Sequence, residues 1–180
     1  DPKVFEVNRE APRAALFNFE SIAAAQRNQS SQSSLHQSLD GSWKFHWARN
    51  PSERPTDFWK PGFDVSGWRD IKVPGIIEAQ GYDRPYYVNE GYPFPMNQPL
   101  MPDDYAPVGS YRRSFDLSPE WQEKDIYLRF NGVGSAIYVW VNGKKVGYSE
   151  STKNPAEFKI TDYLKPGSNS ISVELYRFAD

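Results

Sequence analysis

The stretch that most restricts the possible folds is residues 126–176, where short alternating segments are separated by turn residues. Apolar and polar residues alternate through 126–130, which is the period-2 pattern of a half-buried strand. The segments 136–141 and 145–148 flank Asn142-Gly143, a dipeptide that supplies the two positive-φ positions of a type I′ hairpin turn. This order predicts consecutive antiparallel strands and gives no sign of a βαβ unit.

Other parts of the chain extend the same pattern. Strands are predicted around Trp43, at 68–73 and at 170–176, and one short turn at 161–165 is stopped by Pro166-Gly167. The fold class is therefore predicted to be all-β, an antiparallel sandwich. The core is predicted to hold apolar residues at alternating strand positions: Trp43, Phe45, Leu128, Phe130, Val139, Val141, Ile171, Val173 and Leu175.

The organisation along the chain is uneven. Residues 1–38 contain no clean strand, one possible helical turn at 23–25 and a polar low-complexity stretch, so they are interpreted as an irregular arm. The sandwich is predicted to occupy 39–180. Residues 81–109 hold six of the 15 prolines, and a loop of this length inside a compact domain is usually functional or disordered. Its several tyrosines favour order.

Composition excludes several classes of function. A net charge of −2 favours neither nucleic acid nor an anionic membrane as a partner. No cysteine is present, which excludes disulfides, thiolate metal sites and a cysteine nucleophile. No apolar run approaches the ~20 residues of a membrane-spanning helix. The chain opens at Asp1 without a basic-apolar leader, so we expect any signal peptide to have been removed or never present.

Candidate catalytic groups are few. Asp103-Asp104 is the nearest approach to a paired carboxylate, but it falls in the proline-rich stretch and is interpreted as a solvated turn. His36 and His46 are too few and too isolated for a metal cluster, and His46 is expected at the surface or rim. The glycine-rich stretch 132–135 lacks the strand-to-helix context of a phosphate loop and is interpreted as a bend.

Several separated motifs, in order along residues 5–180, together resemble one family. The sequence resembles the N-terminal sugar-binding domain of glycoside hydrolase family 2, in particular that of the lac-operon type of β-galactosidase. The motifs are Leu39-Asp40-Gly41-Ser42-Trp43-Lys44-Phe45, Val73-Pro74, Gly81-Tyr82-Asp83, Pro85-Tyr86-Tyr87-Val88-Asn89, Tyr92-Pro93, Pro107-Val108-Gly109-Ser110-Tyr111, Phe130-Asn131-Gly132-Val133 and Val141-Asn142-Gly143.

The resemblance implies a jelly-roll, galactose-binding-domain-like sandwich within a longer bacterial enzyme. That enzyme would be a retaining O-glycosyl hydrolase that removes terminal non-reducing β-D-galactose. Its catalytic carboxylates would lie in a TIM barrel outside this chain, so the 180-residue fragment is expected to be inactive. Mg²⁺ and Na⁺ are implied as cofactors with ligands outside the fragment, and Asp180 is not assigned as one. The full-length enzyme would have further β domains and assemble as a homo-oligomer.

Asn89 is the one site residue that the resemblance implies, as a galactose contact in the intact enzyme. A side-chain amide offers donors and an acceptor, which suits a sugar hydroxyl. Residue type alone favours a turn cap at Asn89, and the surrounding motif Tyr87 to Pro93 reverses this in favour of the sugar contact. Glu90 departs from some relatives, which have an apolar residue there, and this leaves the sugar preference open.

Three alternatives remain at this stage. A free-standing carbohydrate-binding module would share the sandwich, and a purely structural interface domain is a second reading. The same domain of a β-glucuronidase or β-mannosidase is the third, although the long arm and the 87–93 loop favour β-galactosidase. The bacterial cytoplasm and periplasm are both compatible with the sequence.

Overall fold

The computed structural model describes residues 3–85, 104–150 and 152–179. Its main feature is a seven-stranded sheet in the order β1-β7-β6-β9-β4-β2-β3. All pairings in it are antiparallel. Its strands are β1 (Glu6–Val7), β2 (Gly41–Ala48), β3 (Arg69–Val73), β4 (Val108–Leu117), β6 (Ala136–Val141), β7 (Lys144–Glu150) and β9 (Gly167–Tyr176).

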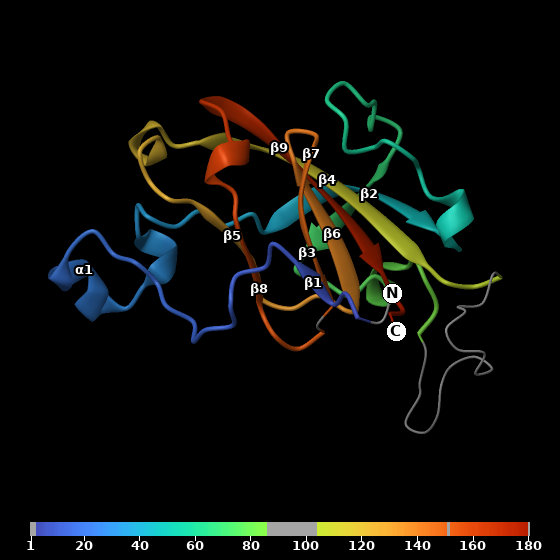
Figure 1. Ribbon diagram of the computed structural model, residues 1–180, viewed down its shortest axis with the longest axis horizontal. Coiled ribbons are helices and arrows are strands. Elements are labelled where there is room, and N and C mark those ends of the chain that lie inside the picture. The colour runs from blue at the N-terminus through green and yellow to red at the C-terminus, as the bar shows by residue number, and fades with distance from the viewer. Residues whose placement is uncertain (1–2, 86–103, 151, 180) are drawn as a thin grey trace.

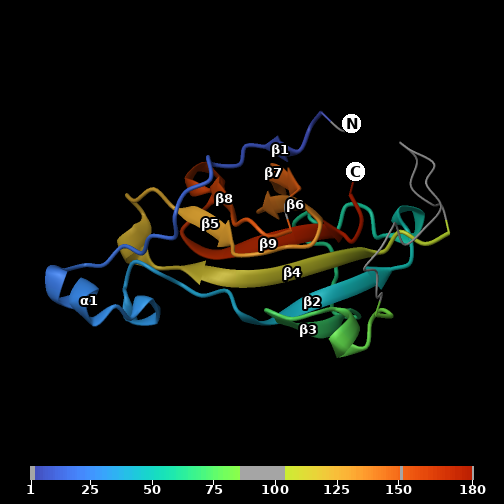
Figure 2. The ribbon, with the colours of Figure 1, turned by 90° about the horizontal axis from the view of Figure 1, so that it is seen from below.

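A second, smaller sheet completes the sandwich. Strands β5 (Tyr127–Phe130) and β8 (Ala156–Lys159) pair antiparallel and lie over one face of the large sheet (Figure 2). Side chains from both sheets form one apolar cluster, with Phe158 and Leu128 from the small sheet and Phe45 and Val139 from the large one. The antiparallel all-β sandwich predicted from the sequence is therefore confirmed.

The turn chemistry agrees with the sequence prediction. Asn142 and Gly143 have φ values of 51° and 84°, so both occupy the left-handed region that a type I′ hairpin between β6 and β7 requires. The short turn expected near residue 163 is a 3-10 helix, η5 (Thr161–Tyr163), and Gly167 adopts a φ of 75° as β9 begins. These local signals set where strands start and stop.

The prediction that nine strand residues are mostly buried is confirmed, and seven of them lie in the fully buried core. Trp43, Phe45, Leu128, Val139, Val141, Ile171 and Val173 are buried. Phe130 and Leu175 are partly buried and pack against this cluster. Phe130 is the last residue of β5, and Leu175 is the last but one of β9.

The other face of the large sheet is covered by the connection between β2 and β3. The 3-10 helix η2 (Pro51–Glu53) opens this connection, and Phe58, further along it, is fully buried. The rings of Trp59 and Trp140 stack with centroids 4.7 Å apart. The Arg112 guanidinium donates to the carbonyl of Phe58 at 2.8 Å. An aromatic-rich loop thus seals the face that does not contact the small sheet.

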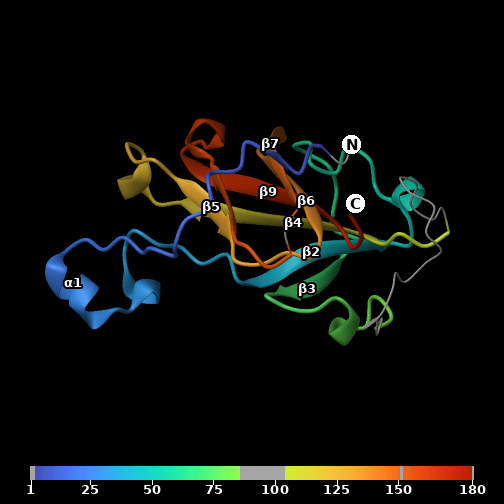
Figure 3. The same cartoon turned by 60° about the horizontal axis from the view of Figure 1, so that its bottom comes forward.

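The N-terminal arm is more ordered than the sequence indicated. Its first part forms the short strand β1 at the edge of the large sheet, which corrects the expectation that the arm holds no strand. It then runs past β8 to the helix α1 (Ile22–Arg27), which lies at one end of the molecule, away from the large sheet (Figures 1 and 3). The Ser21 side chain accepts a hydrogen bond from the Ala24 amide and caps α1, in agreement with the predicted helical turn. Among the described residues, no helix is long and apolar enough to cross a bilayer.

Candidate functional site

The sequence-predicted sugar contact, Asn89, lies outside the described residues, within 86–103. The residues that flank this segment are described, and they lie together. Asp83 precedes the segment, Tyr105 follows it, and Arg177 at the end of β9 contacts both. We call the cluster of Glu78, Asp83, Tyr105 and Arg177 the loop-base cluster.

Local structure brings Asp83 to this position. The 3-10 helix η3 (Glu78–Gln80) ends at Gly81, whose φ of 81° reverses the chain. Tyr82 then packs edge-on against Phe45 with ring centroids 4.7 Å apart, and its hydroxyl donates to the carbonyl of Asp70 at 2.6 Å. Because Tyr82 is fixed on the sandwich, the next side chain, Asp83, is directed toward the end of β9.

The guanidinium of Arg177 is the centre of the loop-base cluster. One of its terminal nitrogens donates to Asp83 Oδ2 at 2.6 Å, and the other donates to Glu78 Oε1 at 2.9 Å. The Asp83 side chain is only 4% exposed, and that of Arg177 is 17% exposed. A planar guanidinium with several donors suits two carboxylates better than the single ammonium of a lysine does.

Tyr105 completes the cluster from the other end of the segment. Its hydroxyl donates to Asp83 Oδ1 at 2.5 Å and lies 3.2 Å from the Arg177 guanidinium, which donates to it. Burial and the hydrogen bond to Asp83 raise the pKa of Tyr105 above its ordinary value. The guanidinium groups of Arg84 and Arg49 lie 4.7 Å and 5.6 Å from the centre of its ring. Arg84 and Arg177 act in the opposite direction on this pKa, but burial and Asp83 have the larger effect.

The carboxylates of the loop-base cluster are engaged in hydrogen bonds and ion pairs within the cluster. A glycoside hydrolase needs one carboxyl group as an acid and another with access to the sugar. Asp83 is nearly buried and accepts hydrogen bonds from Tyr105, Arg177 and the Arg84 amide, so it has no access to a substrate. In the described ranges, no group of three or more acidic, histidine or cysteine side chains could hold a metal ion.

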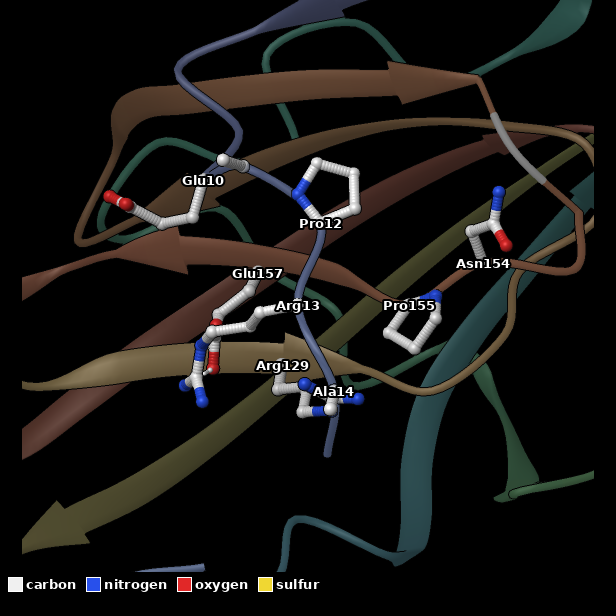
Figure 4. Close-up of a pocket in the computed structure, with 9 residues that line it drawn as sticks. Glu10, Pro12, Arg13, Ala14, Arg129, Asn154, Pro155 and Glu157 are labelled. Carbon is white, nitrogen blue, oxygen red and sulfur yellow. Dashed lines mark hydrogen bonds and ion pairs between the residues drawn. The ribbon is translucent and has the colours of Figure 1, made fainter. Parts of the chain in front are cut away.

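A separate groove of about 300 Å³ lies between the arm and the small sheet (Figure 4). Arg13 from the arm and Glu157 from β8 form a two-point ion pair across it, with distances of 2.9 Å and 2.8 Å. The Arg129 side chain, from β5, also lines the groove, and its Nε donates to Asn131. The groove therefore serves to dock the arm.

The remaining candidate residues behave as follows. Asp104 is exposed, as expected of a solvated turn, whereas Asp103 lies outside the described residues. His46, expected at the surface or rim, is half-buried with its ring 5.5 Å from that of Trp68. The stretch 132–135 forms a bend between β5 and β6, as predicted.

Fold and site together define a class: an antiparallel β-sandwich module in which Arg177 joins the described residues on either side of segment 86–103. Comparison with known proteins identifies the family. The model of the family described as glycosyl hydrolases family 2, sugar binding domain, matches residues 36–180. The chain belongs to this family.

Individual relatives agree with this assignment. The chain is 44% identical to a beta-galactosidase of Priestia megaterium and 42% identical to a beta-galactosidase of Halalkalibacterium halodurans, over 100% and 98% of its length. It spans only 18% of the length of each relative. Among solved structures, a beta-glucuronidase of Bacteroides uniformis matches with a TM-score of 0.60 and 26% identity over 80% of this chain and 15% of that chain.

Sequence reasoning missed the loop-base cluster. The sequence assigns Tyr82 and Asp83 only to a family motif and gives no role to Tyr105 or Arg177. The signal that could have found the cluster is weak: charged and tyrosine residues flank both ends of a long proline-rich segment. Only the pairing of β4 with β9 brings Arg177 beside them.

Proposed function

We propose that this chain is the N-terminal sugar-binding domain of a bacterial β-galactosidase, a retaining hydrolase of terminal β-D-galactose residues. The observation that carries the proposal is the 44% identity to the Priestia megaterium beta-galactosidase across the whole chain. The chain spans 18% of that relative, and we propose that the catalytic carboxylates lie elsewhere in the longer protein. The role of this domain is to contribute to the sugar pocket and to assembly.

Asn89 is the proposed sugar contact. A single amide contact to a hydroxyl contributes about 0.5–1.5 kcal/mol. In the full-length protein, Asn89→Ala should therefore lower kcat/KM for galactosides roughly 2- to 10-fold while the unfolding midpoint is unchanged, since about 1.4 kcal/mol corresponds to a factor of ten. Wild-type kinetics in a correctly folded variant would contradict the assignment.

The alternative of a β-glucuronidase rests on the fold likeness to the Bacteroides uniformis enzyme. Parallel assays of the full-length protein with nitrophenyl β-galactoside and nitrophenyl β-glucuronide separate the two. We expect turnover of the galactoside. A clear preference for the glucuronide would replace β-galactosidase with β-glucuronidase as the activity of the parent.

Cations and assembly are part of the same proposal. We infer from the family resemblance that Mg²⁺ and Na⁺ serve the full-length enzyme and that their ligands lie outside this chain. The arm exposes Leu16, Phe17 and Ile22, which are 69%, 50% and 81% exposed, and these side chains suit contact with a second subunit or another domain of a homo-oligomer. Light scattering of the full-length protein with Leu16→Ser and Ile22→Ser should then give a lower mass than wild type, and an unchanged mass would exclude this contact.

A further inference from the structure

Two Asn-Gly pairs occur in the chain, Asn131-Gly132 and Asn142-Gly143. In such a pair an asparagine side chain reacts readily with its own main chain, because glycine has no side chain to hinder the amide nitrogen that follows. The first pair opens the bend between β5 and β6, and the second is the turn between β6 and β7. Because the dipeptide is the same, a large difference between the two sites in the folded protein would come from tertiary structure.

The side chain of Asn142 is held by three hydrogen bonds. Its Nδ2 donates to the carbonyl of Tyr163 at 2.8 Å and to Asn169 Oδ1 at 2.7 Å. Its Oδ1 accepts from the Ser170 amide at 3.0 Å. Both donor hydrogens of the side-chain amide are therefore in use. Rotation of this side chain toward the amide of the next residue would break all three bonds.

Asn131 has a different environment. Both Asn131 and Gly132 are exposed, and they follow Phe130, the last residue of β5. The Asn131 side chain accepts a hydrogen bond from Arg129 Nε at 3.0 Å through Oδ1. Among the described residues, Asn131 Nδ2 has no hydrogen-bond partner. The side chain can therefore turn toward the Gly132 amide without losing a bond from Nδ2.

The packing around the two glycines differs in the same direction. A Cβ atom on Gly143 would lie 2.7 Å from the Pro61 ring, so this turn packs against the connection between β2 and β3. A Cβ atom on Gly132 would meet only the carbonyl oxygen of Thr152, at 3.6 Å. The main chain at Gly132 thus has room to move, whereas the turn at Gly143 does not.

The hydrogen bond from Arg129 favours attack on the Asn131 side chain. When a nucleophile adds to an amide carbon, negative charge develops on the amide oxygen, and a donor already placed at that oxygen stabilises it. Arg129 Nε supplies this donor from a group that is always cationic. Glu157, which lies opposite Arg129 in the pairing of β5 with β8, forms its ion pair with Arg13 instead.

We propose that Asn131 is a site of spontaneous modification in this protein, whereas the fold protects Asn142. The main-chain nitrogen of Gly132 forms a bond to Cγ of Asn131 as the Cγ–Nδ2 bond breaks. Nδ2 leaves as ammonia with the proton of the Gly132 amide, and a cyclic imide remains. Water then opens the imide at one of its two carbonyls, which gives aspartate or isoaspartate at position 131.

The product carries an additional negative charge beside Arg129. Arg129 lines the groove between the arm and the small sheet (Figure 4), so the modification would give this guanidinium an acidic partner there. The pairing of β5 with β8 ends at Phe130 and Ala156. Isoaspartate at the next position would therefore lengthen the main chain outside the ladder and leave the sandwich folded. This modification does not depend on the proposed function.

The test compares the two asparagines in the full-length protein, which is incubated at mildly alkaline pH either folded or in guanidinium chloride. Mass spectrometry detects the replacement of NH₂ by OH, and fragment ions assign it to one asparagine or the other. Cleavage after Arg129 and Lys144 leaves both in the peptide 130–144, so one spectrum reports both sites. The variants are Gly132→Ala, which hinders the attacking nitrogen, and Arg129→Met, which removes the donor. Thermal unfolding checks that each variant is folded.

In the folded protein we expect Asn131 to be modified roughly tenfold or more faster than Asn142, whose hydrogen bonds must break first. In guanidinium chloride the two sites should react at similar rates, because only the shared dipeptide then matters. Gly132→Ala should slow the reaction at Asn131 in both states. Arg129→Met should slow it several-fold in the folded state alone.

Three results would count against these expectations. Similar rates at the two sites in the folded protein, or faster modification at Asn142, would overturn the protection by the fold. Absence of product at Asn131 in the folded protein, when the unfolded protein is modified there, would overturn the site itself. A wild-type rate in folded Arg129→Met would remove Arg129 from the mechanism.

Discussion

The pKa of His46 shows how the titration of a single side chain depends on the residues that cover it. It lies on the face of β2 that the aromatic loop covers, half-buried against Trp68. Burial disfavours the charged imidazolium and lowers the pKa of His46 below its ordinary value of 6.5. The unfolded chain therefore binds this proton more readily than the folded chain does.

The lowered pKa of His46 predicts that the free energy of unfolding decreases at acidic pH. As the pH falls through 6.5 toward the lower folded pKa, the unfolded state gains the proton first, so the free energy of unfolding decreases. We expect His46→Gln to remove this part of the decrease between pH 7 and pH 5 in urea unfolding. His36→Gln is the control, because the chain has only two histidines. An identical pH profile in wild type and His46→Gln would contradict the assignment.

Two phenylalanines of the small sheet should differ in their contribution to stability. Phe158 is fully buried between the sheets, whereas Phe130 is only partly buried, with ring centroids 6.3 Å apart. Phe158→Ala should cost about 3–5 kcal/mol of unfolding free energy, and Phe130→Ala about 1–2 kcal/mol. Urea unfolding measures both, and equal losses would show that the edge of the core is as tightly packed as its centre.

At the scale of elements, the arm protects sheet edges. The Glu150 amide donates to the carbonyl of Phe5 at 2.9 Å, and the Glu10 amide donates to the carbonyl of Glu157 at 2.8 Å, so the arm pairs with β7 and then with β8. An uncovered edge strand exposes unpaired main-chain groups. The strand β1 is short, but it covers the outer edge of the large sheet.

Because Gly147 on β7 has no side chain, the main chain of the arm at Val7 can approach β7 closely. A Cβ atom there would lie 2.5 Å from the carbonyl oxygen of Val7 and 2.6 Å from the Phe158 ring. Gly147→Ala should therefore cost about 1–3 kcal/mol and speed hydrogen exchange at the amides of Glu10 and Glu150. Gly67→Ala, where the added methyl meets nothing within 4 Å, is the control. Unchanged exchange at both amides would show that the arm tolerates the methyl group.

At the scale of the whole molecule, the chain matches only a part of longer proteins, since it spans 18% of the length of each of the two beta-galactosidases. On the proposed function, a single amide contact from this domain is too weak to offset the cost of immobilising a free sugar. We therefore expect sugar binding and hydrolysis to depend on groups outside these 180 residues.

The isolated chain should accordingly neither hydrolyse nitrophenyl β-galactoside nor bind free galactose measurably at millimolar concentration. The full-length protein in the same assay is the positive control, and calorimetry of the fragment tests binding. Turnover that follows the fragment through two purification columns would contradict this prediction. Binding at millimolar galactose would favour the reading as a carbohydrate-binding module.

What the sequence determined by itself was the class of fold, most strand positions and the family. Alternation along β6 and β9 and the Asn142-Gly143 turn are local properties, since side-chain direction and positive φ depend on neighbouring residues only. The family motifs are also runs of neighbouring residues, so the family can be identified from the sequence alone. Asn89 was named from such a motif and stays a prediction.

The tertiary structure decided which distant residues meet. The pairing of β4 with β9 places Arg177 beside Asp83 and Tyr105, and the pairing of β1 with β7 turns part of an irregular arm into an edge strand. Such contacts depend on register and packing between segments far apart in the chain, and no local pattern encodes them.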